Sequence, residues 1–196
     1  MPAADTREEP RPRVRLSPDA RRALILSAAA AMFQKHGYAA TSIDAIAAAA
    51  GISGPGIYRY FSRKTELLLA LLEAAAADAV TSIEASLAAS SDETAVAAMA
   101  AVLADRAAQE GAVIGLLQST VVDMEADDRA RLDGVRTALV ARLTALLCRA
   151  RPMLGLDHAR VHIEAALSIV GQIARRKPSG EEEARYRHIL RAVLAA

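Results

Sequence analysis

The sequence predicts an all-α protein, and its composition and residue pattern support that prediction. Of its 196 residues 53% are hydrophobic, which is ample for a core and excludes global disorder. Aromatic residues make up only 3%, so most apolar residues are Ala, Leu, Val and Ile, and Ala favours helix over strand. Apolar residues recur at helical spacing, and no strand-like alternation is present.

The chain should begin with an arm and a first helix. Residues 1–17 combine prolines with charged residues, a composition typical of a disordered basic arm. Ser17 followed by Pro18 is a helix-start pattern, and Gly37 is placed to end that helix. We therefore expect one amphipathic helix between these two signals.

Two short helices are expected next. Thr41, as the cap of a capping box, opens a helix over residues 43–50, and Gly51 stops it. Ser53 can cap a second short helix that runs through Phe61. Two short helices joined in this way have the size and spacing of a helix-turn-helix.

The remaining chain reads as a body of longer helices. Their apolar residues fall on one face each, as expected for helices packed around a shared core. The expected elements are a helix capped by Ser62 and reaching Leu87, a helix over 92–109, a stretch interrupted by Gly111 and Gly115 that ends near Met124, a helix over 127–151, a helix from its cap Asp157 to Arg176, and a last helix capped by Ser179 with Glu182.

The near-neutral net charge of +1 hides an uneven distribution. Residues 1–64 hold ten Lys and Arg against five Asp and Glu, whereas the rest holds 14 against 18. Five of the six aromatic residues also lie in this first third. The pattern predicts a polyanion-binding head on a separate scaffold.

Several classes of protein are disfavoured. The lone Cys148 excludes a disulfide framework and a cysteine-based metal site. No apolar run is long enough to cross a bilayer, and the polar N-terminus does not read as a signal peptide, so we expect a cytoplasmic protein without a membrane partner.

Catalytic and metal chemistry are weakly indicated. The sequence has no phosphate-binding glycine loop, nucleophile elbow or zinc-protease motif, so we expect neither an enzyme nor a cofactor. His158 and His162 lie one helical turn apart, but without a third ligand at a fixed spacing they read as packing residues. Residues 181–183 are glutamates at a helix start, which the helix dipole explains.

The helix-turn-helix supplies candidate DNA contacts. Hydroxyl groups of Thr41 and Ser42 can join free amides at a phosphate, and the small Gly54-Pro55-Gly56 segment lets the backbone approach DNA closely. Lys64 begins a helix, against the helix dipole, where only a phosphate partner explains a cation. Side chains with reach into the groove are Tyr58, Arg59 and Tyr60.

Helix-glycine-helix spacing alone favours an ordinary helical hairpin with a solvated basic face. The full string is more specific: GYAATSIDAIA over residues 37–47, then Ala50-Gly51-Ile52-Ser53, then Ile57 to Phe61 with Lys64 three residues on. It resembles the N-terminal signature of TetR-family transcriptional repressors, without a gap from about residue 21 to residue 72.

The resemblance implies a bacterial regulator that binds a palindromic operator as a homodimer and is released by a small molecule. By position, Thr41, Ser42, Tyr58, Tyr60 and Lys64 correspond to backbone contacts, and Gly54, Pro55, Tyr58 and Arg59 to the base-facing surface. Many relatives carry larger residues where Gly54 and Gly56 stand, so base reading here should depend heavily on Arg59. The rival hypothesis is a helical interaction module whose basic head binds an acidic partner without reading DNA sequence.

The chain therefore divides into an arm (1–17), a helix-turn-helix domain (18–64) and a ligand-binding and dimerisation domain (65–196). The last two helices should form the dimer interface as a two-fold four-helix bundle, unless both faces pack on their own chain. The candidate interface residues are Val161, Ala165, Ser168, Ile169, Gln172, Tyr186, Ile189, Leu190 and Val193.

An effector pocket is expected in the body between the helices at about 92–151 and 157–173. With so few aromatic residues there, its ligand should be aliphatic or otherwise apolar. The polar candidates for its wall are Arg106, Gln109, Gln118, Thr120, Asp123, Thr137 and His162.

Overall fold

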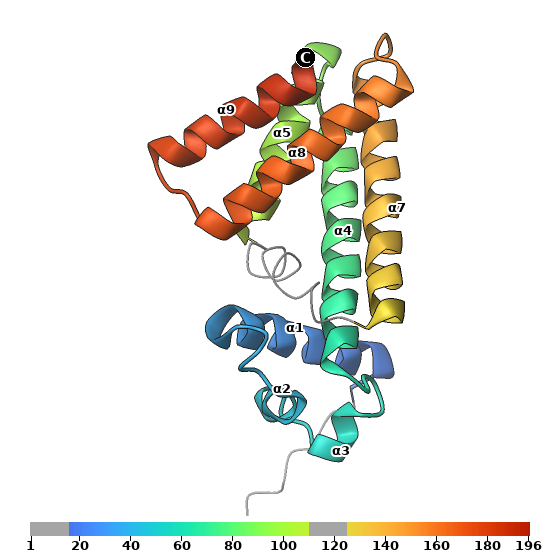
Figure 1. Ribbon diagram of the computed structural model, residues 1–196, viewed down its shortest axis with the longest axis vertical. Coiled ribbons are helices and arrows are strands. Elements are labelled where there is room, and N and C mark those ends of the chain that lie inside the picture. Colours follow the sequence, from blue (N-terminus) through green and yellow to red (C-terminus); the bar gives the residue numbers. More distant parts are fainter. Residues whose placement is uncertain (1–15, 110–124) are drawn as a thin grey trace, which may run out of the picture.

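The computed structural model describes residues 16–109 and 125–196, and every regular element in these two stretches is a helix, as the sequence predicts. Three helices form a small head at one end of the molecule (Figure 1): α1 (Pro18–His36), α2 (Ile43–Ala49) and α3 (Gly54–Ile57). The others form the body: α4 (Lys64–Ala88), α5 (Asp92–Gln109), α7 (Ala126–Ala150), α8 (Leu156–Arg176) and α9 (Glu181–Ala195).

Helix α4 connects head and body. It leaves the head and stands beside α7, while α5 and α9 lie on its other side and α8 crosses diagonally from that side to the upper end of α7 (Figure 1). The expected range of each described body helix agrees with the structure to within a few residues. The stretch expected to end near Met124 lies in residues 110–124, outside the described part of the chain.

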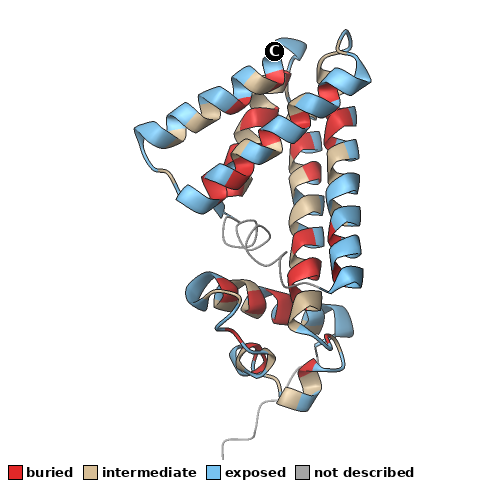
Figure 2. Ribbon diagram, viewed as in Figure 1, coloured by how far each residue is buried: buried red, intermediate tan, exposed pale blue. Residues whose placement is uncertain are grey.

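Two apolar clusters hold the molecule together (Figure 2). The head cluster is built from α1 to α3 and the first turns of α4, where residues 67–70 and Leu72 are buried, and α7 adds Leu132. The body cluster joins α4, α5, α7, α8 and α9 around side chains such as Ile83 and Leu143. The head cluster thus extends beyond residue 64, the proposed end of the first domain.

Several helix starts differ from the sequence-based expectation. Ser42, rather than Thr41, is the N-cap of α2, and its Oγ accepts a hydrogen bond from Ala45 N at 3.1 Å. The N-caps of α4, α8 and α9 are Arg63, Gly155 and Gly180, where Ser62, Asp157 and Ser179 were expected. Each shift is one to two residues, the usual uncertainty at helix ends.

Helix α3 is much shorter than expected. It was expected to run through Phe61 but ends at Ile57, and residues 58–60 form a turn. Gly54, Pro55 and Gly56 fill three of its four positions, and glycine is a poor helix former because it retains so much backbone freedom when unfolded. Burial of Ile57 and Phe61 holds the segment in place instead.

Candidate nucleic-acid interface and body cavity

The α2–turn–α3 unit presents one face to the head core and the other to solvent. Ile46, Ala47 and Ile57 are buried on the inner face. Gly51 has a φ of 65°, a left-handed conformation that glycine adopts without strain, and it reverses the chain between the two helices. The unit has the arrangement of a helix-turn-helix.

The two hydroxyl groups expected at a phosphate lie in different environments. Ser42 is exposed, and because its Oγ only accepts from Ala45 N, its hydroxyl proton remains available to a phosphate. Thr41 is only 3% exposed, and its hydroxyl donates to the Gly37 carbonyl at 2.7 Å. The expected role of Thr41 as a phosphate contact is therefore wrong, because the side chain is turned into the head.

We call residues 54–61 the recognition segment, and its most exposed side chains follow α3. Tyr58 is 48% exposed and Arg59 is also exposed, and within the described part of the chain Arg59 forms no hydrogen bond or ion pair. Tyr60 is half-buried against the head cluster. Tyr58 and Arg59 are thus the candidates with the most reach.

Packing within the head also explains the small residues of α3. A Cβ on Gly54 would lie 3.2 Å from Asp44 Oδ1, and one on Gly56 would lie 2.9 Å from Ser53 Oγ. The glycines therefore allow α3 to lie close to its own cap and to the first turn of α2. Pro55 between them is exposed.

Lys64 is held by the head itself. Its Nζ donates to the carbonyls of Tyr38 at 2.6 Å and Thr41 at 2.9 Å, and it lies 4.2 Å from the centre of the Tyr38 ring. Burial lowers the pKa of Lys64 below its usual value. The inference that only a phosphate explains a lysine here is wrong, because the α1–α2 connection supplies its partners.

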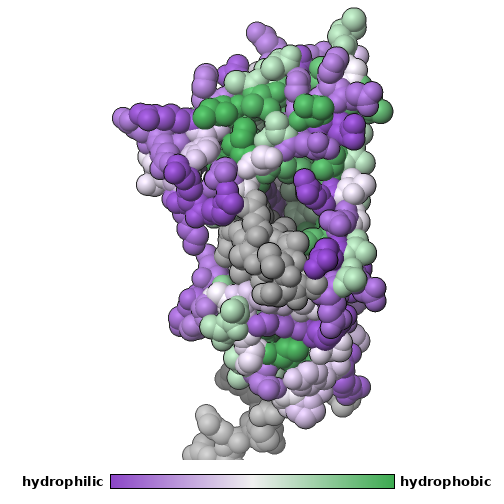
Figure 3. Space-filling view, in the orientation of Figure 1, coloured by the Kyte–Doolittle hydropathy of each residue, from purple (hydrophilic) through white to green (hydrophobic). Residues whose placement is uncertain are grey.

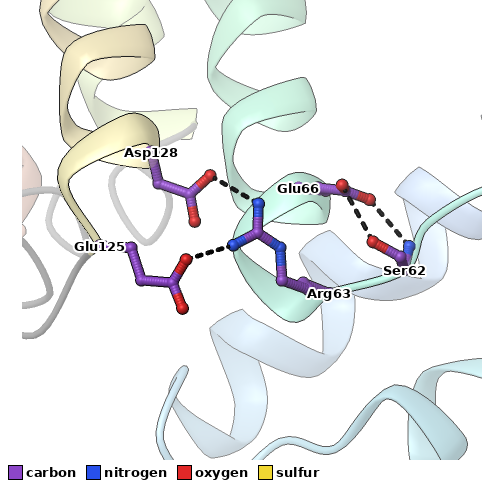
Figure 4. Close-up of polar contacts among 5 residues, drawn as sticks. All are labelled: Ser62, Arg63, Glu66, Glu125 and Asp128. Atoms are coloured by element: carbon purple, nitrogen blue, oxygen red, sulfur yellow. Dashed lines mark hydrogen bonds and ion pairs between the residues drawn. The ribbon is translucent and has the colours of Figure 1, made fainter.

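A second contact fixes the turn between the recognition segment and α4 (Figure 4). The Glu66 carboxylate accepts from the backbone N of Ser62 at 2.8 Å and from its Oγ at 3.0 Å. These hydrogen bonds, led by the backbone one, lower the pKa of Glu66 although partial burial opposes them. Glu66 thus acts as a capping residue that reaches back from α4.

Arg63 joins the head to the start of α7. Its Nη1 lies 2.8 Å from Glu125 Oε2 and its Nη2 lies 3.2 Å from Asp128 Oδ1, as Figure 4 shows. Sequence reasoning missed this group, because Arg63 is more than 60 residues away from both acids and acids at a helix start are expected for the dipole alone. We call Arg63, Glu125 and Asp128 the interdomain clamp.

The body contains a cavity of about 540 Å³ between α4, α5, α7 and α8. Figure 3 shows a hollow in the middle of the body on this face, with green apolar side chains beside it. The apolar residues of its wall are Leu72, Ala75, Ala76, Ala79, Leu103, Leu132, Val135, Leu139, Val140, Leu143, Leu167 and Val170, and the polar ones are Arg106, Asp133, Arg136, Glu164 and Ser168. Helix α4, which lies outside the range expected from the sequence, forms one of its walls.

The residues expected to line an effector pocket are scattered. Arg106 lines the cavity, where its Nη2 donates to Ser82 Oγ at 2.7 Å. Gln109 lines a separate hollow of about 180 Å³, and Thr137 is exposed and lies away from both walls. His162 is half-buried in α8 and is not in the cavity wall. Gln118, Thr120 and Asp123 lie outside the described residues.

Of the residues of α8 and α9 expected in the dimer interface, some are exposed and others are buried in the core of their own chain. Val161 is 57% and Ile189 45% exposed. Leu190 is fully buried in the body cluster of its own chain, so its assignment to the interface is wrong. Ala165, Gln172 and Ser168 are exposed, although Ser168 also lines the cavity, and Ile169, Tyr186 and Val193 are half-buried against the same core.

The described residues form neither a metal-binding cluster nor a membrane-spanning helix. Residues 16–109 and 125–196 contain no group of three or more His, Cys, Asp and Glu side chains placed to hold a metal ion. Within the same residues no helix combines the length and apolar character needed to cross a membrane.

Comparison with known proteins identifies the head. The model of the family "Bacterial regulatory proteins, tetR family" matches residues 25–71. The HTH-type transcriptional activator FasR of Mycolicibacterium smegmatis is 48% identical over 59 residues, which are 30% of this chain and 27% of FasR. The match thus spans about a quarter of that relative.

Solved structures match over most of the chain. FadR of Bacillus halodurans superposes with a TM-score of 0.73 at 18% identity, over 92% of this chain and 96% of its own. FadR of Bacillus subtilis, solved in complex with stearoyl-CoA, gives 0.71 at 17% identity, over 88% and 97%. PfmR of Thermus thermophilus gives 0.66 at 22% identity, over 88% and 97%. Residues 25–71 therefore form the N-terminal domain of the tetR family of bacterial regulatory proteins, and the chain as a whole shares the fold of these solved structures.

Proposed function

We propose that this protein is a cytoplasmic, effector-responsive regulator of transcription that binds a palindromic operator as a homodimer. The observation that carries the proposal is the exposure of Ser42, Tyr58 and Arg59 on a helix-turn-helix whose opposite face is buried. Phosphate contacts position such a unit on DNA, and side chains after α3 read the bases.

Selection of binding sites from random duplex DNA tests this function. A sequence reader enriches a palindrome and prefers it over scrambled DNA at every salt concentration, whereas a generic basic patch shows salt dependence without preference. Enrichment of no sequence would support the rival interaction module and contradict the proposal. The repressor predicted from the resemblance remains a prediction, since FasR is named an activator, and a reporter placed behind the enriched site measures the direction of regulation.

Homodimerisation is supported by the apolar residues left exposed on α8 and α9. Val161 and Ile189 have about half their surface open to solvent on helices whose other faces are buried. In an isologous interface both subunits contribute the same residues, so one substitution to a charged residue places two like charges in the interface.

We expect the Val161→Asp/Ile189→Asp variant to weaken dimerisation at least about 100-fold while it leaves the monomer folded. Sedimentation equilibrium measures the dissociation constant, and circular dichroism checks the helix content. Leu156→Asp is the matched control, because Leu156 is an exposed leucine of α8 outside the proposed interface. A variant that remains as dimeric as the control would contradict this interface. Leu190→Asp is unsuitable, because it would bury a charge in the body core.

The cavity is the proposed effector site. The described residues of its wall are mostly Ala, Leu and Val and include no aromatic ring, which suits an aliphatic ligand better than a stacked planar one. One solved neighbour, FadR of Bacillus subtilis, holds stearoyl-CoA, a molecule with a long aliphatic chain. Thermal-shift measurements with aliphatic compounds, followed by operator release, test the site, and a compound that stabilises the protein without changing operator affinity would contradict its role as an effector.

A further inference from the structure

The interdomain clamp is a second connection between head and body, separate from the continuous helix α4. Arg63 is the N-cap residue of α4. Two nitrogens of its guanidinium pair with the carboxylates of Glu125, the N-cap of α7, and Asp128 in the first turn of that helix. A guanidinium held at two nitrogens is fixed in direction as well as in position. The clamp therefore constrains how the head is oriented and not only where it lies.

Burial of Asp128 distinguishes this clamp from an ordinary surface ion pair. Its side chain is 1% exposed, and Oδ2 is buried without a hydrogen-bond partner among the described residues. Exposed ion pairs contribute little, but an acid left buried without its cation is strongly unfavourable. Arg63 cannot swing away from α7 without leaving that charge uncompensated.

Asp128 also acts on the connection between α1 and α2. Burial, and after it the negative charge of Asp128, raises the pKa of Tyr38 in that connection. The Tyr38 carbonyl in turn accepts from Lys64. One turn further along α7, Leu132 packs into the head cluster. Helix α7 thus holds the head through both polar and apolar contacts.

We propose that the clamp determines which spacing between operator half-sites the protein accepts. The inference rests on the proposed dimeric operator binding. If α4 were the sole connection, each head would pivot about it, whereas a second attachment at α7 removes this rotation. One inserted base pair moves the half-sites apart by about 3.4 Å and rotates them by about 35°. A rigid pair of heads rejects that change, and a pivoting pair accepts it.

The test compares Asp128→Asn with Asp127→Asn on two DNA duplexes, the selected operator and the same operator with one base pair inserted at its centre. Asp127 is the matched control, because it is the neighbouring exposed acid on α7 and forms no ion pair within the described residues. Wild type and control should strongly prefer the correct spacing. Asp128→Asn should lower that preference about fivefold or more, with no loss of affinity for a single half-site.

Arg63→Gln breaks the clamp from the head side and serves as a second, independent variant. Thermal unfolding of both variants reveals any folding defect. The same loss of spacing preference is expected. A folded Asp128→Asn or Arg63→Gln protein that keeps the wild-type preference overturns the inference, and so does an equal loss on the single half-site. Failure of the wild type to bind any palindrome would instead defeat the proposed function, and with it the inference.

Discussion

Arg59→Ala should remove much of the preference for the operator over scrambled DNA while it leaves non-specific binding largely intact. Arg59 is exposed directly after α3, opposite the buried anchors Ile57 and Phe61. A guanidinium that bonds O6 and N7 of a guanine contributes about 1–3 kcal/mol of discrimination at each half-site. Each half-site should therefore lose about 5- to 150-fold in specificity.

Binding isotherms on operator and scrambled duplexes at two salt concentrations measure this effect. Arg22→Ala is a useful comparison, because Arg22 is an exposed arginine of the same head that lies 5.2 Å from the Phe61 ring. Parallel losses on both duplexes after Arg59→Ala would make Arg59 a backbone contact. Specificity would then come from Tyr58, from the close approach of α3 or from DNA shape.

Lys64→Met should weaken operator and scrambled DNA alike without changing the salt dependence of binding. The ammonium holds the carbonyls of Tyr38 and Thr41, so its loss releases the connection that positions Ser42 and the start of α2. Loss of these partly exposed hydrogen bonds should cost about 1–2 kcal/mol of stability. For a protein of this size that lowers Tm by about 2–8 °C.

The salt slope separates this positioning role from a phosphate contact. Removal of a true contact flattens the slope by about one unit per half-site, because one fewer counterion is released. Lys35→Met, at an exposed lysine in the last turn of α1, controls for the loss of a positive charge from the head. A flattened slope with unchanged Tm would show that Lys64 contacts DNA directly.

Local signals in the sequence predicted the helices well. Ser17 with Pro18, Gly37 and Gly51 act within a few residues, and the structure uses each of them at a helix boundary or turn. The same reasoning assigned Thr41 and Ser42 equal roles, because a hydroxyl pattern does not show which side chain faces the core. Only the packing of α1 on α2 turns Thr41 inward toward the Gly37 carbonyl.

Contacts between residues far apart in the sequence could not be predicted from such local signals. The charge of Lys64 was correctly seen as unusual at a helix start, yet its partners come from a loop more than 20 residues earlier. Leu190 followed an apolar stripe on α9, but a stripe alone does not distinguish packing within a chain from packing between chains. The clamp and the α4 wall of the cavity depend likewise on how distant helices meet.

Leu132 belongs to a helix of the body but packs in the head cluster, and this has a consequence for folding during synthesis. The head occupies the start of the chain, yet its apolar cluster includes a side chain of α7 that follows Leu72 by 60 residues. Because ribosomes add about 5–20 residues per second, synthesis of these 60 residues takes about 3–12 s. During that interval the helix-turn-helix of a ribosome-bound chain has already been synthesised, but the head cluster on which it packs still lacks Leu132.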